Sequence, residues 1–180
     1  KNTDDAKAWE EFLFYYRDFL SIIIYKIRGF KDHFSEDLLQ TALLEVWRSL
    51  PKFDPSGEAK FRTWLSRVVR YTVIDELKKE TKFSEKSNAL DAIPQLAESE
   101  LEELIRREWE MHITRLALNN ISKRFTGKAI KVFEMSLTGA KIEQICEELE
   151  LTTDSAYTLK NRVKKYLILE IKRLREELES

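Results

Sequence analysis

Residues 35–79 read SEDLLQTALLEVWRSLPKFDPSGEAKFRTWLSRVVRYTVIDELKK, and they set the helical character of the chain. Apolar residues recur every three or four positions on both sides of a short break, which predicts two amphipathic helices. Ser35 precedes two acidic residues, as an N-cap does, and Pro51 ends the first helix because its ring and missing N–H disrupt the helical pattern. The break holds two of the chain's three prolines and one of its four glycines. We therefore expect a stiff polar loop between the two helices.

The same helical spacing covers most of the remaining chain. Residues 81–99 lack it and combine Ser, Asn and Pro with acidic residues, which indicates a linker. The sequence therefore predicts an all-α fold of two small helical domains, residues 1–82 and 101–180, joined by a flexible acidic linker at 83–100. The predicted helices cover about 9–27, 35–50, 59–79, 101–113, 128–137, 141–149 and 154–178.

Composition restricts the class of protein. The formal net charge of −1 gives no support for nucleic-acid binding by the chain as a whole, so local patches must supply it. The single cysteine, Cys146, excludes an internal disulfide and fits a reducing compartment. Since no apolar run is long enough to span a bilayer and no signal peptide is visible, we expect a cytoplasmic protein without membrane insertion.

The sequence gives no indication of an enzyme. His33 and His112 are far apart, and neither belongs to a catalytic or metal-binding motif. No glycine-rich phosphate loop is present. Cys146 falls on the apolar face of a predicted helix, where an inert core thiol is a simpler interpretation than a nucleophile. We therefore expect no catalytic residue, no metal and no cofactor.

Residues 140–167 contain the pattern of a helix-turn-helix. A predicted helix buries Ile145 and Leu149, and only two residues separate it from Thr152, an N-cap for the next helix. Glu150 stands where many such turns carry glycine, and a left-handed backbone there would cost it about 1 kcal/mol. A helical hairpin with a solvated basic face is the alternative interpretation.

The outer face of the second of these helices carries side chains suited to DNA. Asn and Arg can read base edges in the major groove, and Thr or Tyr can contact a base or a phosphate. Residues 160–175 hold seven Lys or Arg against one Glu, a local charge of +6 that attracts phosphates. The candidate DNA-contacting residues are Thr153, Ser155, Tyr157, Thr158, Asn161, Arg162, Lys164 and Lys165.

The predicted helix at 35–50 has apolar residues outside its buried stripe of Leu39, Leu43, Val46, Trp47 and Leu50. Leu38 falls on the polar side of a helical wheel, and Leu44 lies near the edge of the stripe. Exposed apolar residues indicate a partner surface, although single surface leucines are common. The candidate partner surface comprises Asp37, Leu38, Gln40, Thr41, Leu44 and Arg48.

Taken together, these stretches resemble the extracytoplasmic-function (ECF, group 4) sigma factors of bacterial RNA polymerase. Residues 35–79 resemble their second conserved region, with Asp-Leu-x-Gln, Val-Trp, Phe-x-x-Trp-Leu and Ile-Asp-Glu-Leu-Lys in order. Residues 139–167 resemble their fourth region, a helix-turn-helix that reads the promoter. The resemblance, over about 9–82 and 113–178, implies an alternative sigma factor that binds core RNA polymerase and directs promoter-specific transcription initiation.

The resemblance answers why a stiff loop follows the 35–50 helix. In such factors this loop captures a base flipped out of the −10 promoter element, and Pro55 and Gly57 can shape its backbone. Phe61 and Trp64 lie on the buried stripe, so we expect them to anchor the loop to the core. The residues implied in −10 binding are Phe53, Asp54, Ser56, Gly57, Lys60, Arg62, Arg67, Arg70, Tyr71 and Asp75.

The resemblance also implies partners and leaves some roles open. The candidate partner surface would dock on a coiled coil of the polymerase largest subunit, and the helix-turn-helix would read the −35 element. Tyr71 stands where family members often carry Asn, and Asp75 either lines the −10 site or caps a core network. The acidic linker either threads a polymerase channel or acts as a plain tether. An anti-sigma factor is expected by family analogy.

Two other classes of protein fit parts of the sequence. A helix-turn-helix regulator with an N-terminal helical sensor or dimerisation domain would bind duplex DNA alone, as a dimer on a palindrome. A protein-binding helical adaptor would keep its function when Asn161 and Arg162 become alanine. A sigma factor would instead bind core polymerase as a monomer.

Overall fold

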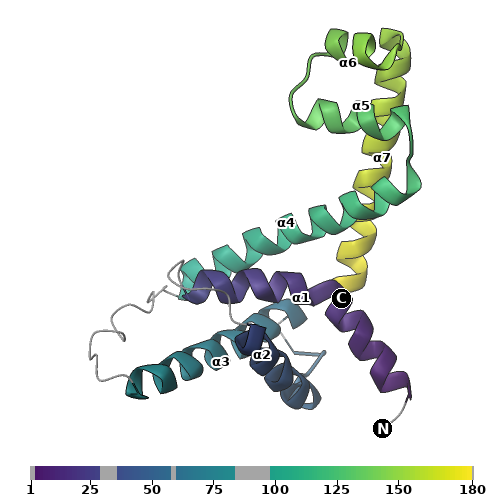
Figure 1. Ribbon diagram of the computed structural model, residues 1–180. Coiled ribbons are helices and arrows are strands. Elements are labelled where there is room, and N and C mark those ends of the chain that lie inside the picture. Colours follow the sequence, from purple (N-terminus) through teal and green to yellow (C-terminus); the bar gives the residue numbers. More distant parts are fainter. Residues whose placement is uncertain (1–2, 29–35, 58–59, 84–97, 180) are drawn as a thin grey trace. The chain divides into compact units, whose positions relative to one another are not determined.

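The computed structural model describes residues 3–28, 36–57, 60–83 and 98–179. Within these ranges the chain is helical and contains no strand, so the all-α prediction is confirmed. Figure 1 shows the elements along the chain. They are α1 (Thr3–Arg28), α2 (Glu36–Ser49), the short 3-10 helix η1 (Leu50–Lys52), α3 (Phe61–Phe83), α4 (Glu98–Arg124), α5 (Lys128–Leu137), α6 (Ile142–Leu149) and α7 (Thr153–Leu178).

Capping and helix-breaking residues set several helix ends where the sequence predicts them. Thr152 has an extended backbone before α7, and its Oγ1 accepts a hydrogen bond from the Ser155 N–H at 3.3 Å. Pro51 lies within η1, so the regular helix α2 stops just before it. Ser35, the predicted cap of α2, lies outside the described residues.

The chain divides into two compact units, Lys1–Glu110 and Met111–Ser180. The division falls inside α4, which continues past the predicted end at 113 because Ala117 and Ile121 extend its buried side. Residues 101–110 therefore group with the first unit, whereas the sequence assigned them to the second domain. Most of the predicted linker, residues 84–97, lies outside the described part of the chain.

The first unit is built from α1, α2, α3 and the first half of α4. Trp109 of α4 is fully buried; its ring stacks on Tyr16 with 5.5 Å between centroids and meets Phe19 edge-on at 5.0 Å. Beside it, the Lys26 ammonium donates a hydrogen bond to the buried carboxylate of Glu108. An aromatic anchor and a partly buried ion pair thus hold α4 against α1. Other fully buried residues of this unit are Leu20, Ile23, Leu39, Val46, Leu65, Val69 and Val73.

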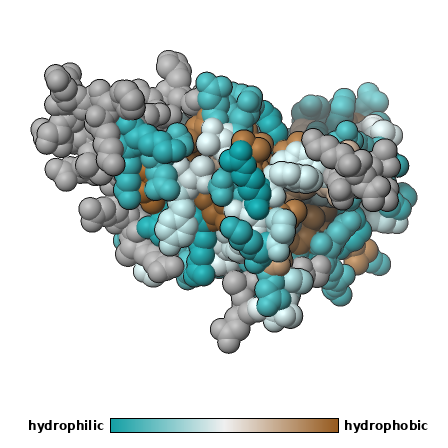
Figure 2. Space-filling model, turned by 90° about the horizontal axis from the view of Figure 1, so that it is seen from below, coloured by the Kyte–Doolittle hydropathy of each residue, from teal (hydrophilic) through white to brown (hydrophobic). Residues whose placement is uncertain are grey.

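Two predictions about α2 are wrong. Leu38 is buried, with 7% of its surface exposed, because α2 packs against both α1 and α3 and its buried arc is wider than one stripe. Trp47, predicted to be buried, is 40% exposed and lies edge-on to Trp9 of α1 with 4.9 Å between ring centroids. On the face shown in Figure 2, hydrophobic residues form separate patches between hydrophilic ones.

The second unit contains the rest of α4 with α5, α6 and α7. Its core has two clusters of buried residues. One joins Ile121, Phe125, Phe133 and Val163, and the other joins Val132, Ile145, Leu149 and Ala156. The apolar sides predicted for the helix-turn-helix are therefore confirmed, and Cys146 lies half-buried against the second cluster.

Candidate nucleic-acid interface

The turn between α6 and α7 contains a strained residue. Glu150 adopts a left-handed backbone, with φ 50° and ψ 59°, and it is the one non-glycine residue with positive φ in the described ranges. The turn is closed by the Leu151 N–H, which donates to the Cys146 carbonyl at 3.0 Å, and Lys128 Nζ donates to the Glu150 carbonyl at 3.5 Å. The cost of about 1 kcal/mol for a residue with a Cβ is therefore present in this turn.

The outer face of α7 is open to solvent as the sequence predicts. All eight candidate residues, Thr153, Ser155, Tyr157, Thr158, Asn161, Arg162, Lys164 and Lys165, are exposed. The opposite side is anchored by Ala156 and Val163, which are fully buried. Ser155 is partly committed to the N-cap, since its hydroxyl lies 2.8 Å from the Thr152 Oγ1. Contact between this face and DNA stays a prediction.

The loop between α2 and α3 contains a turn held by one carboxylate. Asp54 Oδ1 accepts hydrogen bonds from the Ser56 N–H at 2.9 Å and the Ser56 hydroxyl at 2.7 Å. Both bonds hold the pKa of Asp54 below its ordinary value, and the bond from the hydroxyl has the larger effect. Gly57 does not have a left-handed backbone, but a Cβ there would lie 3.3 Å from the Asp54 carbonyl oxygen. A side chain at position 57 would thus be disfavoured by this close approach and not by its φ angle.

Three aromatic rings, those of Phe53, Phe61 and Trp64, hold this loop against the rest of the first unit. Phe53 lies 5.2 Å from Phe61 and 5.2 Å from Trp64, measured between ring centroids. Phe61 lies 5.6 Å from Tyr16 of α1. The predicted anchoring by Phe61 and Trp64 is confirmed. Phe53, one of the predicted −10 residues, is half-buried among the same rings, and its contact with DNA stays a prediction.

The basic residues of α3, and Lys60 just before it, do not share one open surface. Lys60 is exposed, whereas Arg62 is half-buried with its guanidinium carbon 5.9 Å from the centroid of the buried Trp109 ring. Arg67 is exposed, and its Nη2 lies 3.5 Å from Glu102 Oε1 of α4. Arg70 is half-buried. Arg62 and Arg70 are therefore less exposed than Lys60 and Arg67 of the predicted −10 set.

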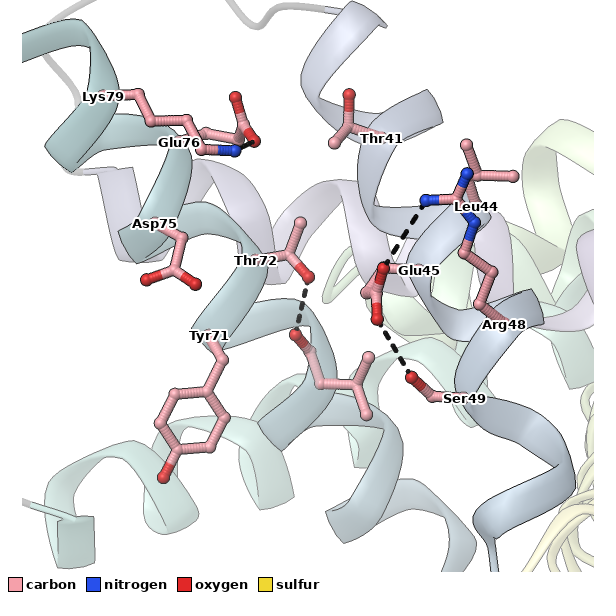
Figure 3. Close-up of a pocket in the computed structure, with 11 residues that line it drawn as sticks. Thr41, Leu44, Glu45, Arg48, Ser49, Tyr71, Thr72, Asp75, Glu76 and Lys79 are labelled. Atoms are coloured by element: carbon pink, nitrogen blue, oxygen red, sulfur yellow. Dashed lines mark hydrogen bonds and ion pairs between the residues drawn. The ribbon is translucent and has the colours of Figure 1, made fainter.

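A groove between α2 and α3 brings the two predicted surfaces of the first unit together. Figure 3 shows Leu44 and Arg48 on α2 across from Tyr71 and Asp75 on α3. Tyr71 is 65% exposed and Asp75 is exposed, so Asp75 does not cap a core network. The remaining partner-surface candidates of α2, Asp37, Gln40 and Thr41, are also exposed.

Three charged residues of this groove, Glu45, Glu76 and Lys79, were missed by the sequence reasoning. Glu76 and Lys79 line it beside Asp75, and Lys79 Nζ lies 2.7 Å from Glu76 Oε1. Figure 3 shows this pair on α3, farther along the helix than Tyr71 and Asp75. The available signal was spacing, because Tyr71, Asp75 and Lys79 follow one another at intervals of four residues on one helix face.

Other kinds of site find no support in the described part of the chain. No group of three or more His, Cys, Asp or Glu residues there could hold a metal ion. Among the same residues, no helix combines the length and the apolar character needed to cross a membrane. His33 lies outside the described residues.

Comparison with known proteins identifies similarity in the first unit. Residues 15–83, which include most of α1 and all of α2, η1 and α3, match the family model of Sigma-70 region 2. The RNA polymerase sigma-D factor of Bacillus subtilis (strain 168) is 31% identical over 85 residues, which cover 44% of this chain and 32% of that protein. The chain thus aligns with about a third of that relative's length. No solved structure gives a significant match.

Proposed function

We propose that this chain is an alternative sigma factor that binds core RNA polymerase and directs promoter-specific transcription initiation. The observation that carries the proposal is the match of residues 15–83 to Sigma-70 region 2. That segment contains the loop after α2, the groove between α2 and α3, and the exposed side of α2. The similarity to a sigma-D factor over 85 residues points the same way.

The first unit would hold the opened −10 element. A flipped base requires a pre-shaped pocket and a stacking surface, because unstacking costs a few kcal/mol that binding must offset. The Asp54–Ser56 turn supplies fixed polar groups at the surface, and Tyr71 supplies an exposed ring. Stacking on such a ring contributes about 1–3 kcal/mol per base. Only non-covalent binding is required, so the proposed activity is not enzymatic.

The second unit would read the −35 element through α7. The support is geometric: a two-residue turn, a capped second helix and an outer face rich in Asn, Arg, Lys and Tyr. A helix of this kind fits the major groove of B-DNA. The combination of a region 2 segment with a C-terminal helix-turn-helix across a short linker favours an ECF sigma factor. By analogy with that group, an anti-sigma partner and a cytoplasmic location belong to the same proposal.

The polymerase would bind the exposed side of α2. Leu44 is 49% exposed at the rim of the groove, next to Thr41 and Arg48. Leu38 is left out of this surface because it is buried. An apolar residue within a polar rim is typical of protein interfaces, where a few side chains carry most of the binding energy.

Binding of purified core polymerase by the full chain tests this assignment. Leu44→Ala should weaken binding tenfold or more, which corresponds to about 1.4 kcal/mol. Phe14→Ala is the control, since Phe14 is a 64% exposed apolar residue of the same unit on α1. If the two variants weaken binding of core polymerase equally, α2 is not the docking surface. If the chain does not bind core polymerase but binds palindromic duplexes as a dimer, it is a helix-turn-helix regulator instead.

A further inference from the structure

Cationic and aromatic side chains alternate between the end of α4 and the middle of α7. The guanidinium carbon of Arg162 lies 5.7 Å from the centroid of the Phe125 ring. Phe125 meets Tyr166 edge-on at 5.2 Å, and the guanidinium carbon of Arg124 lies 4.5 Å from the Tyr166 centroid. Arg162, a predicted DNA-contacting residue, is therefore linked through two rings to a second arginine on another helix.

Two surface hollows of the second unit meet at Tyr166. One is lined by Tyr166 with Asn161, Arg162 and Lys165, all predicted to contact DNA. The other is lined by Tyr166 with residues of α4 and α7 that the sequence reasoning did not single out. Lys123 and Arg124 lie in this second hollow, and both are exposed. The predicted DNA-binding face therefore continues onto the end of α4.

The second hollow carries an excess of positive charge. Its one acidic residue among the described residues is Glu170, whose Oε1 accepts hydrogen bonds from Asn120 Nδ2 at 2.7 Å and Arg173 Nη2 at 2.8 Å. Arg173, the larger cause, and Asn120 hold the pKa of Glu170 below its ordinary value, so Glu170 stays ionised and pairs with Arg173, which also pairs with Glu177. Lys123 and Arg124 then add two positive charges at the rim.

We infer that Lys123 and Arg124 form a second phosphate-binding site, which takes the backbone of duplex DNA beside the stretch contacted by α7. The inference rests on the proposed DNA binding by the helix-turn-helix. A guanidinium that is already stacked on a ring loses less conformational entropy when it binds a phosphate. The stacking of Arg124 on Tyr166 therefore favours phosphate binding.

Salt dependence of DNA binding tests the site directly. Binding of the full chain to a short fluorescent duplex is measured at several salt concentrations, for the natural chain and for Lys123→Ala/Arg124→Ala. Loss of two phosphate contacts should lower the slope of log K against log salt by about 1.8. Between 50 and 200 mM salt the natural chain should then lose about twelvefold more affinity than the variant.

The matched control is Arg115→Ala/Lys131→Ala. It removes the same charge from exposed positions of α4 and α5 in the second unit that line neither hollow, and its slope should equal that of the natural chain. Circular dichroism of both variants checks that the helices are retained. An unchanged slope for Lys123→Ala/Arg124→Ala, or an equal fall in the control, overturns the inference. So does weaker binding of core polymerase with an unchanged DNA slope, which would make the hollow a protein-binding surface.

The outcome is separable from that of the proposed function. If the chain supports initiation by core polymerase and the slope is unchanged, the sigma-factor proposal stands and the second phosphate site fails. If the slope falls as expected but no initiation depends on the chain, the site stands and the proposed function fails.

Discussion

Replacing Glu150 by glycine should stabilise the second unit. Glu150 has φ 50°, where a Cβ costs about 1–2 kcal/mol that glycine does not incur. Glycine also makes the unfolded chain more flexible, which offsets roughly 0.4–1 kcal/mol of this gain. The net expectation is about 0.5–1 kcal/mol. For a unit of this size, that corresponds to a rise in Tm of roughly 2–8 °C.

The four tryptophans give this experiment an internal reference. Trp9, Trp47, Trp64 and Trp109 all belong to the first unit, so tryptophan fluorescence follows that unit alone. Circular dichroism follows the helices of both units. Glu150→Gly should raise the Tm of the transition that circular dichroism assigns to the second unit. It should leave the Tm of the fluorescence transition unchanged.

Alanine at the same position separates strain from charge. Glu150→Ala removes the carboxylate but keeps a Cβ, so it should leave stability within about 0.5 kcal/mol of the natural chain. If glycine stabilises no more than alanine does, the left-handed turn holds no strain and the reasoning is wrong.

Other predictions concern the first unit. Leu38→Ala should lower the free energy of unfolding by about 2–3 kcal/mol in urea titrations, because Leu38 is buried. Leu44→Ala should change this free energy by less than about 0.5 kcal/mol, because Leu44 is exposed. A larger loss for Leu44→Ala than for Leu38→Ala would contradict the packing of α2. The pKa of Asp54 measured by NMR should lie below its ordinary value, since hydrogen bonds from Ser56 favour the charged form, and Ser56→Ala should raise that pKa by removing the hydroxyl; an unchanged pKa would show that the hydroxyl does not bond the carboxylate. Because this pKa is depressed on folding, the turn is favoured above the unfolded pKa and is lost as pH falls through the folded pKa. Trp109→Ala should cost about 3–5 kcal/mol in urea unfolding of the first unit, and a loss below 1 kcal/mol would show that α4 is not anchored there.

Helix positions could be predicted from the sequence because apolar residues recur with helical period and clear breakers separate them. Pro51 and Thr152 mark boundaries by local chemistry, and both act as predicted. Burial on α2 was harder. A helical wheel assumes one buried stripe, but α2 packs against two helices, so Leu38 turns inward while Trp47 stays near the surface.

The remaining features depend on residues far apart in the chain. Lys123 lies next to the predicted DNA-binding face only because the end of α4 packs beside α7, and no local pattern signals that packing. Likewise, Arg62 faces the ring of Trp109, so a position that looks open on its own helix is half-buried. The sequence indicates that a left-handed turn at Glu150 would be costly. The turn is adopted because the chain reverses between the end of α6 and the start of α7.

Transcription in vitro with purified core polymerase and a promoter library tests the central claim most directly. The account predicts transcripts that require the chain and begin downstream of promoters sharing a −10 and a −35 element. Tyr71→Ala should lower opening of these promoters while leaving binding of core polymerase intact. A library that yields no chain-dependent transcript, with the chain folded and core polymerase active with another sigma factor, would contradict the account.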